Sequence, residues 1–333
     1  MPTVPDLKRA CKVKGLKGYS KLRKTELLKL LETINLGPRR SGPRRSVPRR
    51  SAPRRSVPRR SAPRRSAPSV LLISPDKKNI IDLFTANVKG NVADTSNSSK
   101  KHCGKEGHWL EKQMGIRHNS KNEPDMYGYE MKTDCVKTTF GDYSASEYLF
   151  SKKQVLLDTL NGWNIKNIVL RSDFIKIFGL PNHDKNGRYS WSGKCVPKYG
   201  KWNDCGQTME INDTNDIIAY YMYSKDKRDD GIKDFFPDYL KVKDKVAYAI
   251  WKSDKLSVQI NRKFNNKGFF ICKKDKQGVY DKIVFGRPFD FIEFIQGIKD
   301  NKIIFDSGMY DGNSRNYSQF RASSTGFWNT LLI

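Results

Sequence analysis

The sequence predicts a mixed α/β protein in which a central sheet is flanked by helices on both faces. Short runs rich in β-branched and aromatic residues, such as 216–223, 283–285 and 303–305, are typical of strands. Between these runs lie stretches in which apolar residues recur at helical spacing. A chain of 333 residues is long enough for one such layered body of about 250 residues with additional N-terminal parts.

The first part of the chain, residues 1–36, predicts a small separate helical unit. Apolar residues follow helical spacing from Val4 to Lys14 and again from Leu22 to Leu31, with a glycine-containing turn between them. Nine Lys or Arg against three Asp or Glu make this unit basic. A basic helix pair suits nucleic acid, and docking on a protein partner is the alternative.

Residues 37–68 form a repeat, Pro-Arg-Arg-Ser-x, that occurs six times. Proline at every fifth position interrupts helical hydrogen bonding, and the paired arginines repel one another, so the repeat predicts a disordered, extended linker. Its twelve arginines contribute strongly to the formal net charge of +28. Charge concentrated in this way predicts a polyanionic partner, and binding to that partner should weaken as the salt concentration rises.

The remaining residues, 69–333, are expected to form the main domain. Ser74 and Pro75 predict the start of a helix, because Ser is favoured at the cap and Pro in the first turn. The further expected elements are a helix over 104–116, strands around 125–132, 168–170 and 216–223, a helix after Pro237 through Ile250, a hairpin of 268–271 and 283–285 around 277–278, and a strand at 303–305.

The segment 123–132, EPDMYGYEMK, places two carboxylates and a lysine close together. On a strand, Glu130 and Lys132 project to the same side, while Gly128 permits a bend that brings Asp125 to them. Carboxylate oxygens suit Mg²⁺, and a neighbouring lysine can neutralise charge that develops at phosphorus. Glu111, on the helix expected just upstream, could join the site. Charges that alternate on an exposed, non-catalytic strand are the alternative reading of the same pattern.

Four blocks in order, GKEGHWLEKQMGI, NEPDMYGYEMKT, GRYSWSG and SQFRAS, resemble the MvaI/BcnI-type restriction endonucleases of the PD-(D/E)xK superfamily. The resemblance spans residues 100–330. It implies a restriction-endonuclease-like domain in which Asp125 and Glu130 bind Mg²⁺, Lys132 is the catalytic lysine and Glu111 is a helix-borne acid of the same site. It further implies a monomeric enzyme that cuts double-stranded DNA at a short sequence, one strand at a time. Residues 1–36 resemble the SAP and Rho-N helical modules.

Two other functions remain compatible with the sequence. A basic N-terminus attached to an inert nuclease fold would give a non-catalytic DNA-binding or packaging protein, and a structure-specific repair nickase would use the same catalytic residues. The residues expected to touch DNA lie in polar loops: His118, Arg188, Tyr189, Trp191, Lys194 and Arg321. For Tyr189 and Trp191, packing against the core is the alternative, and for His118 it is a solvated loop.

The six cysteines show no C-x-x-C pair, so we expect reduced thiols. Zinc binding by Cys103 with His108, or by Cys195 with Cys205, is the alternative. No apolar run approaches the length of about 20 residues that a membrane span requires, and nothing near the N-terminus resembles a signal peptide. These observations predict a soluble intracellular protein of the cytoplasm or nucleus that has no membrane partner and no obligate protein partner.

Overall fold

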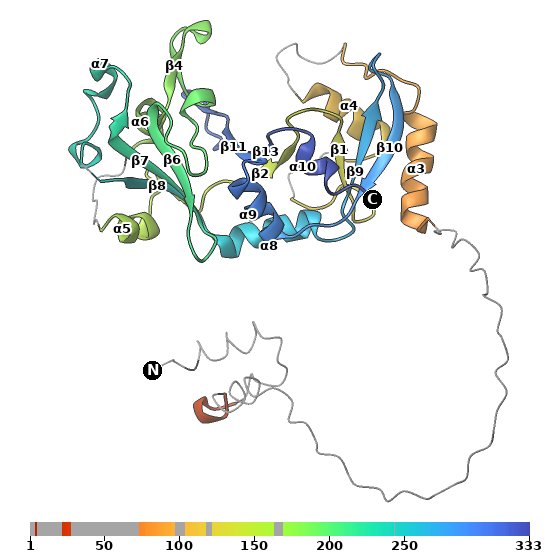
Figure 1. Ribbon diagram of the computed structural model, residues 1–333, viewed down its shortest axis with the longest axis horizontal. Helices are drawn as coiled ribbons and strands as arrows, with labels where there is room; N and C mark the ends of the chain where they lie inside the picture. The colour runs from red at the N-terminus through yellow and green to blue at the C-terminus, as the bar shows by residue number, and fades with distance from the viewer. Residues whose placement is uncertain are drawn as a thin grey trace, which may run out of the picture. The chain divides into compact units, whose positions relative to one another are not determined.

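The computed structural model describes residues 4, 22–27, 73–96, 104–117, 122–162, 169–242 and 244–333 (Figure 1). The chain divides into two compact units, Met1–Ser69 and Val70–Ile333. In the first unit, residues 24–27 are helical and the backbone N–H of Arg23 donates to the Glu26 carboxylate. The rest of the expected N-terminal module and the whole arginine repeat lie outside the described residues.

Among its described residues, the second unit contains two hydrophobic clusters that meet at one strand: Phe269 and Ile271 belong to the larger cluster, and Phe270 and Cys272 to the smaller. The smaller cluster packs two helices, α3 (Pro75–Asn87) and α4 (Lys105–Gln113), against a three-stranded sheet. The larger cluster fills the space between the remaining sheets and helices. Figure 1 shows α3, α4, β1, β9 and β10 gathered at one end of this unit, with β6, β7 and β8 at the other end.

The small sheet carries the predicted catalytic segment. Its order is β1-β9-β10, with β1 at Glu130–Thr133, β9 at Phe269–Lys274 and β10 at Tyr280–Gly286. Strand β1 runs parallel to β9, and β9 forms an antiparallel hairpin with β10. Residues from very different parts of the sequence are therefore hydrogen-bonded neighbours at the site.

Three further sheets lie in the described part of this unit. Their orders are β3-β8-β7-β6, β11-β13-β2 and β12-β5-β4. The strands are β2 (Thr139–Asp142), β3 (Glu147–Tyr148), β4 (Leu180–Asn182), β5 (Arg188–Trp191), β6 (Cys205–Ile211), β7 (Ile217–Asp226), β8 (Val246–Trp251), β11 (Ile303–Ser307), β12 (Met309–Tyr310) and β13 (Ser318–Ala322). The mixed α/β class is thus confirmed, but the strands form several small sheets instead of one central sheet.

Helices complete the unit. Beyond α3 and α4 they are α5 (Val155–Asn161), α6 (Arg171–Phe178), α7 (Asp230–Lys233), α8 (Ser253–Phe264), α9 (Phe291–Lys299) and α10 (Gly326–Asn329). Helix α8 matters most for the site, because it leads from β8 of the large cluster directly to β9 of the small sheet. It buries Leu256, Ile260 and Phe264, which are spaced by four residues and so share one face.

Several expected elements are confirmed. Helix α3 begins at Pro75, and the Ser74 hydroxyl accepts from the backbone N–H of Lys77, as the cap preference predicts. The expected hairpin around residues 277–278 is β9-β10, and the late strand is β11. Among the described residues, no helix has the length and apolar character that crossing a membrane requires.

Three expectations were wrong. In place of the helix expected from Pro237 through Ile250, the structure has a short 3₁₀ turn, Asp238–Leu240, followed by the strand β8. The β8 residues VAYAIW are buried on both faces of the strand, so their sequence lacks the alternation of apolar and polar residues that marks a strand with one exposed face. Of the strand expected at 168–170, residue 168 lies outside the described residues, Val169 is in no strand, and Leu170 occupies the N-cap position of α6. Cys195 and Cys205, expected as free thiols, form a disulfide that joins the turn after β5 to β6. Their ten-residue separation matches no standard motif, so the sequence carried no signal for the pair.

Candidate active site

A tight turn brings Asp125 to the start of β1. The backbone groups of Met126 and Tyr129 exchange two hydrogen bonds, with N···O distances of 3.0 and 2.8 Å. The two residues between them, Tyr127 and Gly128, have φ angles of 49° and 84°. Two positive φ values are the requirement of a type I′ hairpin turn, for which glycine is well suited. The bend predicted at Gly128 is therefore confirmed.

The segment that joins α8 to β9 holds this turn in place. The backbone N–H of Lys267 donates to the carbonyl of Gly128, with an N···O distance of 3.1 Å, and the N–H of Glu130 donates to the carbonyl of Gly268 at 3.0 Å. The Asn266 side chain lies against Gly128 so closely that a Cβ atom on the glycine would be 3.1 Å from Asn266 Nδ2. The end of α8 and the acidic hairpin thus form one hydrogen-bonded assembly.

Asp125 is fixed beside the first acid of the strand. Its Oδ2 accepts a hydrogen bond from the backbone N–H of Met131, with an N···O distance of 2.8 Å. Burial and the negative charge of Glu130 raise the pKa of Asp125 to about 7. The negative charge of Glu130 thus disfavours ionisation of Asp125, and a cation bound beside them would offset this effect.

Glu130 and Lys132 lie together, as the strand alternation predicts. The Lys132 ammonium is 2.7 Å from Glu130 Oε1, and both side chains are almost completely buried. The Lys132 Nζ atom also lies 5.4 Å from the centre of the Phe264 ring and 5.9 Å from that of Trp328. Burial lowers the pKa of Lys132. This face of β1 is therefore enclosed by aromatic rings.

A second lysine, which the sequence analysis missed, reaches the same carboxylate. Lys263, in the last turn of α8, places its Nζ 3.0 Å from Glu130 Oε1. Basic residues are common in the last turn of a helix, and Arg262 stands beside it, so no sequence signal distinguished Lys263.

The acids present fit a divalent cation. Glu130 Oε2 is buried and has no hydrogen-bond partner among the described residues, while Asp125 supplies oxygens next to it. An unsatisfied buried acceptor is costly, and carboxylate oxygens are preferred ligands of Mg²⁺, which keeps several waters when it binds to only one or two carboxylates. Within the described part of the chain, no group of three or more His, Cys, Asp or Glu side chains is arranged to hold one ion.

Glu111 lies near this site without completing a three-acid cluster. Helix α4 packs beside β1, since a Cβ atom on Gly107 would be 3.9 Å from Thr133 Cγ2. Glu111, which is half-buried, follows Gly107 by one helical turn and so lies on the same face of α4.

The residues expected to contact DNA are scattered in the structure. Trp191 is fully buried and donates its indole N–H to Gln207, so this expectation was wrong and its alternative, core packing, holds. Tyr189 is half-buried and packs against the larger cluster. Arg188 stacks on Tyr310, with 3.8 Å between its guanidinium carbon and the ring centre. The two others that the structure describes are Lys194, which is exposed, and Arg321, which pairs with Asp306 at 2.7 Å. His118 lies outside the described residues.

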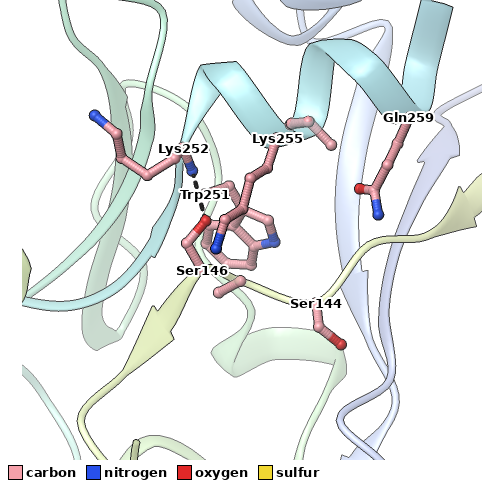
Figure 2. Close-up of a pocket in the computed structure, with 8 residues that line it drawn as sticks. Ser144, Ser146, Trp251, Lys252, Lys255 and Gln259 are labelled. Atoms are coloured by element: carbon pink, nitrogen blue, oxygen red, sulfur yellow. Dashed lines mark hydrogen bonds between the residues drawn. The ribbon is translucent and has the colours of Figure 1, made fainter. Parts of the chain in front are cut away.

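A cavity of about 230 Å³ lies at the other end of α8 (Figure 2). Its lining includes Ser144, Ser146, Trp251, Lys255 and Gln259. None of the acids or lysines at the start of β1 lines it. Figure 2 shows the Lys255 side chain directed toward Ser146 and Trp251. The cavity is therefore separate from the carboxylate site, although the same helix contributes to both.

Comparison with known proteins assigns this chain to a family. The family described as LlaMI restriction endonuclease matches residues 88–333. The type II restriction enzyme ScrFI of Lactococcus lactis subsp. cremoris is 39% identical over 272 residues, which cover 78% of this chain and 98% of ScrFI. The chain belongs to the LlaMI restriction endonuclease family. As an enzyme it is a type II restriction endonuclease, so the resemblance found in the sequence is confirmed at this level.

Two solved structures are similar to this restriction endonuclease at low identity. The complex of restriction endonuclease MvaI with its cognate DNA substrate covers 77% of the chain and 96% of MvaI, at 12% identity and a TM-score of 0.49. MvaI in the absence of DNA covers 78% and 97%, at 14% identity and a TM-score of 0.37. The family match contains Glu111, Asp125, Glu130 and Lys132 and begins after the arginine repeat.

We predict that Gly128→Ala impairs the restriction endonuclease through the position of Asp125. The positive φ of 84° and the contact with Asn266 should cost at least about 1 kcal/mol of stability and distort the turn. Gly278, in the β9-β10 turn, has the same φ of 84° and no neighbour within 4 Å, so Gly278→Ala is a matched control. DNA cleavage and thermal unfolding should show that both variants lose stability, whereas only Gly128→Ala loses cleavage. Equal cleavage by the two variants would contradict this role.

The pKa of Asp125 predicts how stability depends on pH without metal. Because its folded-state value of about 7 exceeds the 3.8 of an exposed Asp, the folded protein binds more protons than the unfolded chain between about pH 4 and pH 7. The stabilisation is complete below about pH 4 and is lost as the pH rises through about 7.

Asp125→Asn should therefore gain stability relative to the wild type, by at most a few kcal/mol, when the pH is raised from about 5 to about 8. Urea unfolding in EDTA measures this difference. Asp281→Asn removes an exposed carboxylate on β10 and serves as the control. A difference between Asp125→Asn and the wild type that stays constant across this pH range would contradict the shifted pKa.

Proposed function

We propose that this restriction endonuclease hydrolyses phosphodiester bonds of double-stranded DNA at a short specific sequence, with Mg²⁺ held by Asp125 and Glu130. The observation that carries the proposal is the partly buried Asp125 carboxylate next to the buried Glu130 carboxylate. Oε2 of Glu130 has no hydrogen-bond partner among the described residues, and its Oε1 is paired with the ammonium of Lys132. When bound, Mg²⁺ would polarise a phosphoryl oxygen and lower the pKa of a bound water.

The protein residues have distinct tasks in this proposal. Lys132 donates to a phosphate oxygen and neutralises the negative charge that grows there during in-line displacement. To do so it turns from Glu130 Oε1, to which it is bound in the structure. Phe264 and Trp328 surround its ammonium and limit the access of water, which strengthens its interaction with the phosphate. Glu111 supports the site from α4.

Outside the catalytic centre, we assign residues to DNA contact by their positive charge and their exposure to solvent. We assign Arg188, Lys194, Arg321 and His118 to the DNA backbone, and Tyr189 to a supporting position next to Arg188. Residues 1–36 carry a net charge of +6, and the repeat adds twelve arginines, so this part binds DNA without reading its sequence and raises the local DNA concentration. A single catalytic centre in a monomer cuts one strand at a time, which is the expected mode.

Membership of a restriction endonuclease family disfavours the inert packaging protein considered from the sequence. The repair nickase would use the same catalytic residues and is separated from the present proposal by its choice of substrate. Sequencing the ends of cleaved DNA decides between them, because a restriction enzyme leaves ends at one fixed sequence.

We predict that Glu130→Gln and Lys132→Met each reduce Mg²⁺-dependent plasmid cleavage by at least about 100-fold, because each removes a group that acts on the transition state. Methionine fills the buried space of Lys132 without its charge. The control is Glu106→Gln, which removes a surface carboxylate paired with Lys274 and should leave cleavage intact. EDTA should abolish cleavage by the wild type. Wild-type rates in Glu130→Gln would refute the assignment.

Deletion of residues 37–68 should weaken DNA binding and flatten its salt dependence. Each neutralised phosphate contributes about 0.9 to the slope of log affinity against log salt, so the loss of twelve arginines should lower this slope by several units. Replacing every Arg with Lys keeps the charge and should keep the slope. The cleavage position should not change in either variant. A slope unaffected by the deletion would exclude the repeat from DNA binding.

A further inference from the structure

We propose that Lys263 is a positioning residue of this endonuclease, which anchors Oε1 of Glu130 so that Oε2 stays available to a divalent cation and Lys132 is free to turn toward the phosphate. The inference rests on the proposed function. It adds a residue from α8 that touches no reacting atom and acts through Glu130.

Only one of the two carboxylate oxygens of Glu130 has hydrogen-bond partners among the described residues. Lys132 Nζ lies 2.7 Å and Lys263 Nζ 3.0 Å from Oε1, whereas Oε2 is buried and has no hydrogen-bond partner among the described residues. A buried carboxylate with two ammonium groups on one oxygen has a fixed orientation. The other oxygen then points into the site with its lone pairs unused, as a metal ligand requires.

Packing and backbone hydrogen bonds fix the position of Lys263 next to Glu130. Its neighbour Phe264 is fully buried at the end of the apolar face of α8, and the Lys263 side chain itself is only 14% exposed. Immediately after the helix, the backbone of Lys267 and Gly268 is hydrogen-bonded to the hairpin that carries Asp125 and Glu130. The end of α8 therefore cannot shift without moving the acids with it.

The second lysine allows Oε1 of Glu130 to keep an ammonium partner when Lys132 turns toward the phosphate. If Lys132 alone held Oε1 of Glu130, its turn toward the phosphate would leave that buried oxygen without a hydrogen-bond donor, even with a divalent cation on Oε2, and this is unfavourable. With Lys263 in place, Oε1 keeps an ammonium throughout. Lys263 also prevents the carboxylate from rotating and offering Oε2 to Lys132 in competition with the cation.

A simple electrostatic account predicts the opposite effect on metal binding. If Lys263 acted only as a nearby positive charge, its removal would relieve repulsion and tighten the binding of a divalent cation. If it fixes the ligand, its removal loosens binding, because losing a group that orients a metal ligand typically reduces metal affinity or activity about 10- to 100-fold. The sign of the change in metal affinity separates the two accounts.

The experiment compares Lys263→Met, Lys263→Arg and Lys255→Met in the full-length chain. Methionine removes the charge and the donor at similar length, whereas arginine keeps both. Lys255 is the matched control: it lies on the same helix two turns earlier, about 12 Å along the axis, and Figure 2 shows it at the cavity on the other end of α8. Three quantities are measured: Mn²⁺ binding to the DNA-free protein by electron paramagnetic resonance, the single-turnover cleavage rate in Mg²⁺, and thermal unfolding in EDTA.

We expect Lys263→Met to lower both Mn²⁺ affinity and the cleavage rate by about tenfold or more. Lys263→Arg should restore most of both, and Lys255→Met should match the wild type. Mn²⁺ affinity that is unchanged or tighter in Lys263→Met, while the wild type cleaves normally, overturns the inference. Failure of the wild type to cleave in Mg²⁺ overturns the proposed function instead. If Lys263→Met does not fold, Lys263→Gln provides the same comparison, with the same outcomes for and against.

Discussion

The ion pairs on Glu130 are the interaction on which the site depends. A carboxylate that is 2% exposed requires compensation, and the structure supplies two ammonium groups on the same oxygen. One comes from the strand that carries the acid and the other from a helix more than one hundred residues later in the chain. Burial of the charge thereby ties β1 to α8, and it leaves the second carboxylate oxygen buried without a hydrogen-bond partner among the described residues.

Backbone geometry makes this arrangement precise. The turn at Tyr127 and Gly128 directs Asp125 back onto β1, where the N–H of Met131 fixes its carboxylate. The parallel pairing of β1 with β9 then locks the strand to the segment that follows α8. The backbone that carries the acids and Lys132 is consequently fixed by hydrogen bonds at the small sheet, whereas the position of Lys263 depends on packing between α8 and this sheet.

The two hydrophobic clusters of the main unit stabilise different parts of it. The smaller cluster packs α3 and α4 against the β1-β9-β10 sheet, whereas Phe264 and Trp328, the rings near the Lys132 ammonium, belong to the larger cluster. Helix α8 joins them, with a cavity at its start and Lys263 at its end. The family match covers residues 88–333 of this unit, and the basic repeat lies before the matched region.

The sequence by itself determined the restriction endonuclease family, through four motif blocks spread over residues 100–330. It also determined the proximity of Asp125, Glu130 and Lys132, the cap of α3 and the β9-β10 hairpin, because each of these features depends on residues that are close together in the chain. Only the tertiary structure decided the rest. Long-range packing turned the run at 246–251 into a buried strand, enclosed Trp191 and brought Cys195 to Cys205. It also brought Lys263 to Glu130, since a contact between distant segments depends on how they fold together and leaves no periodic or local pattern in the chain.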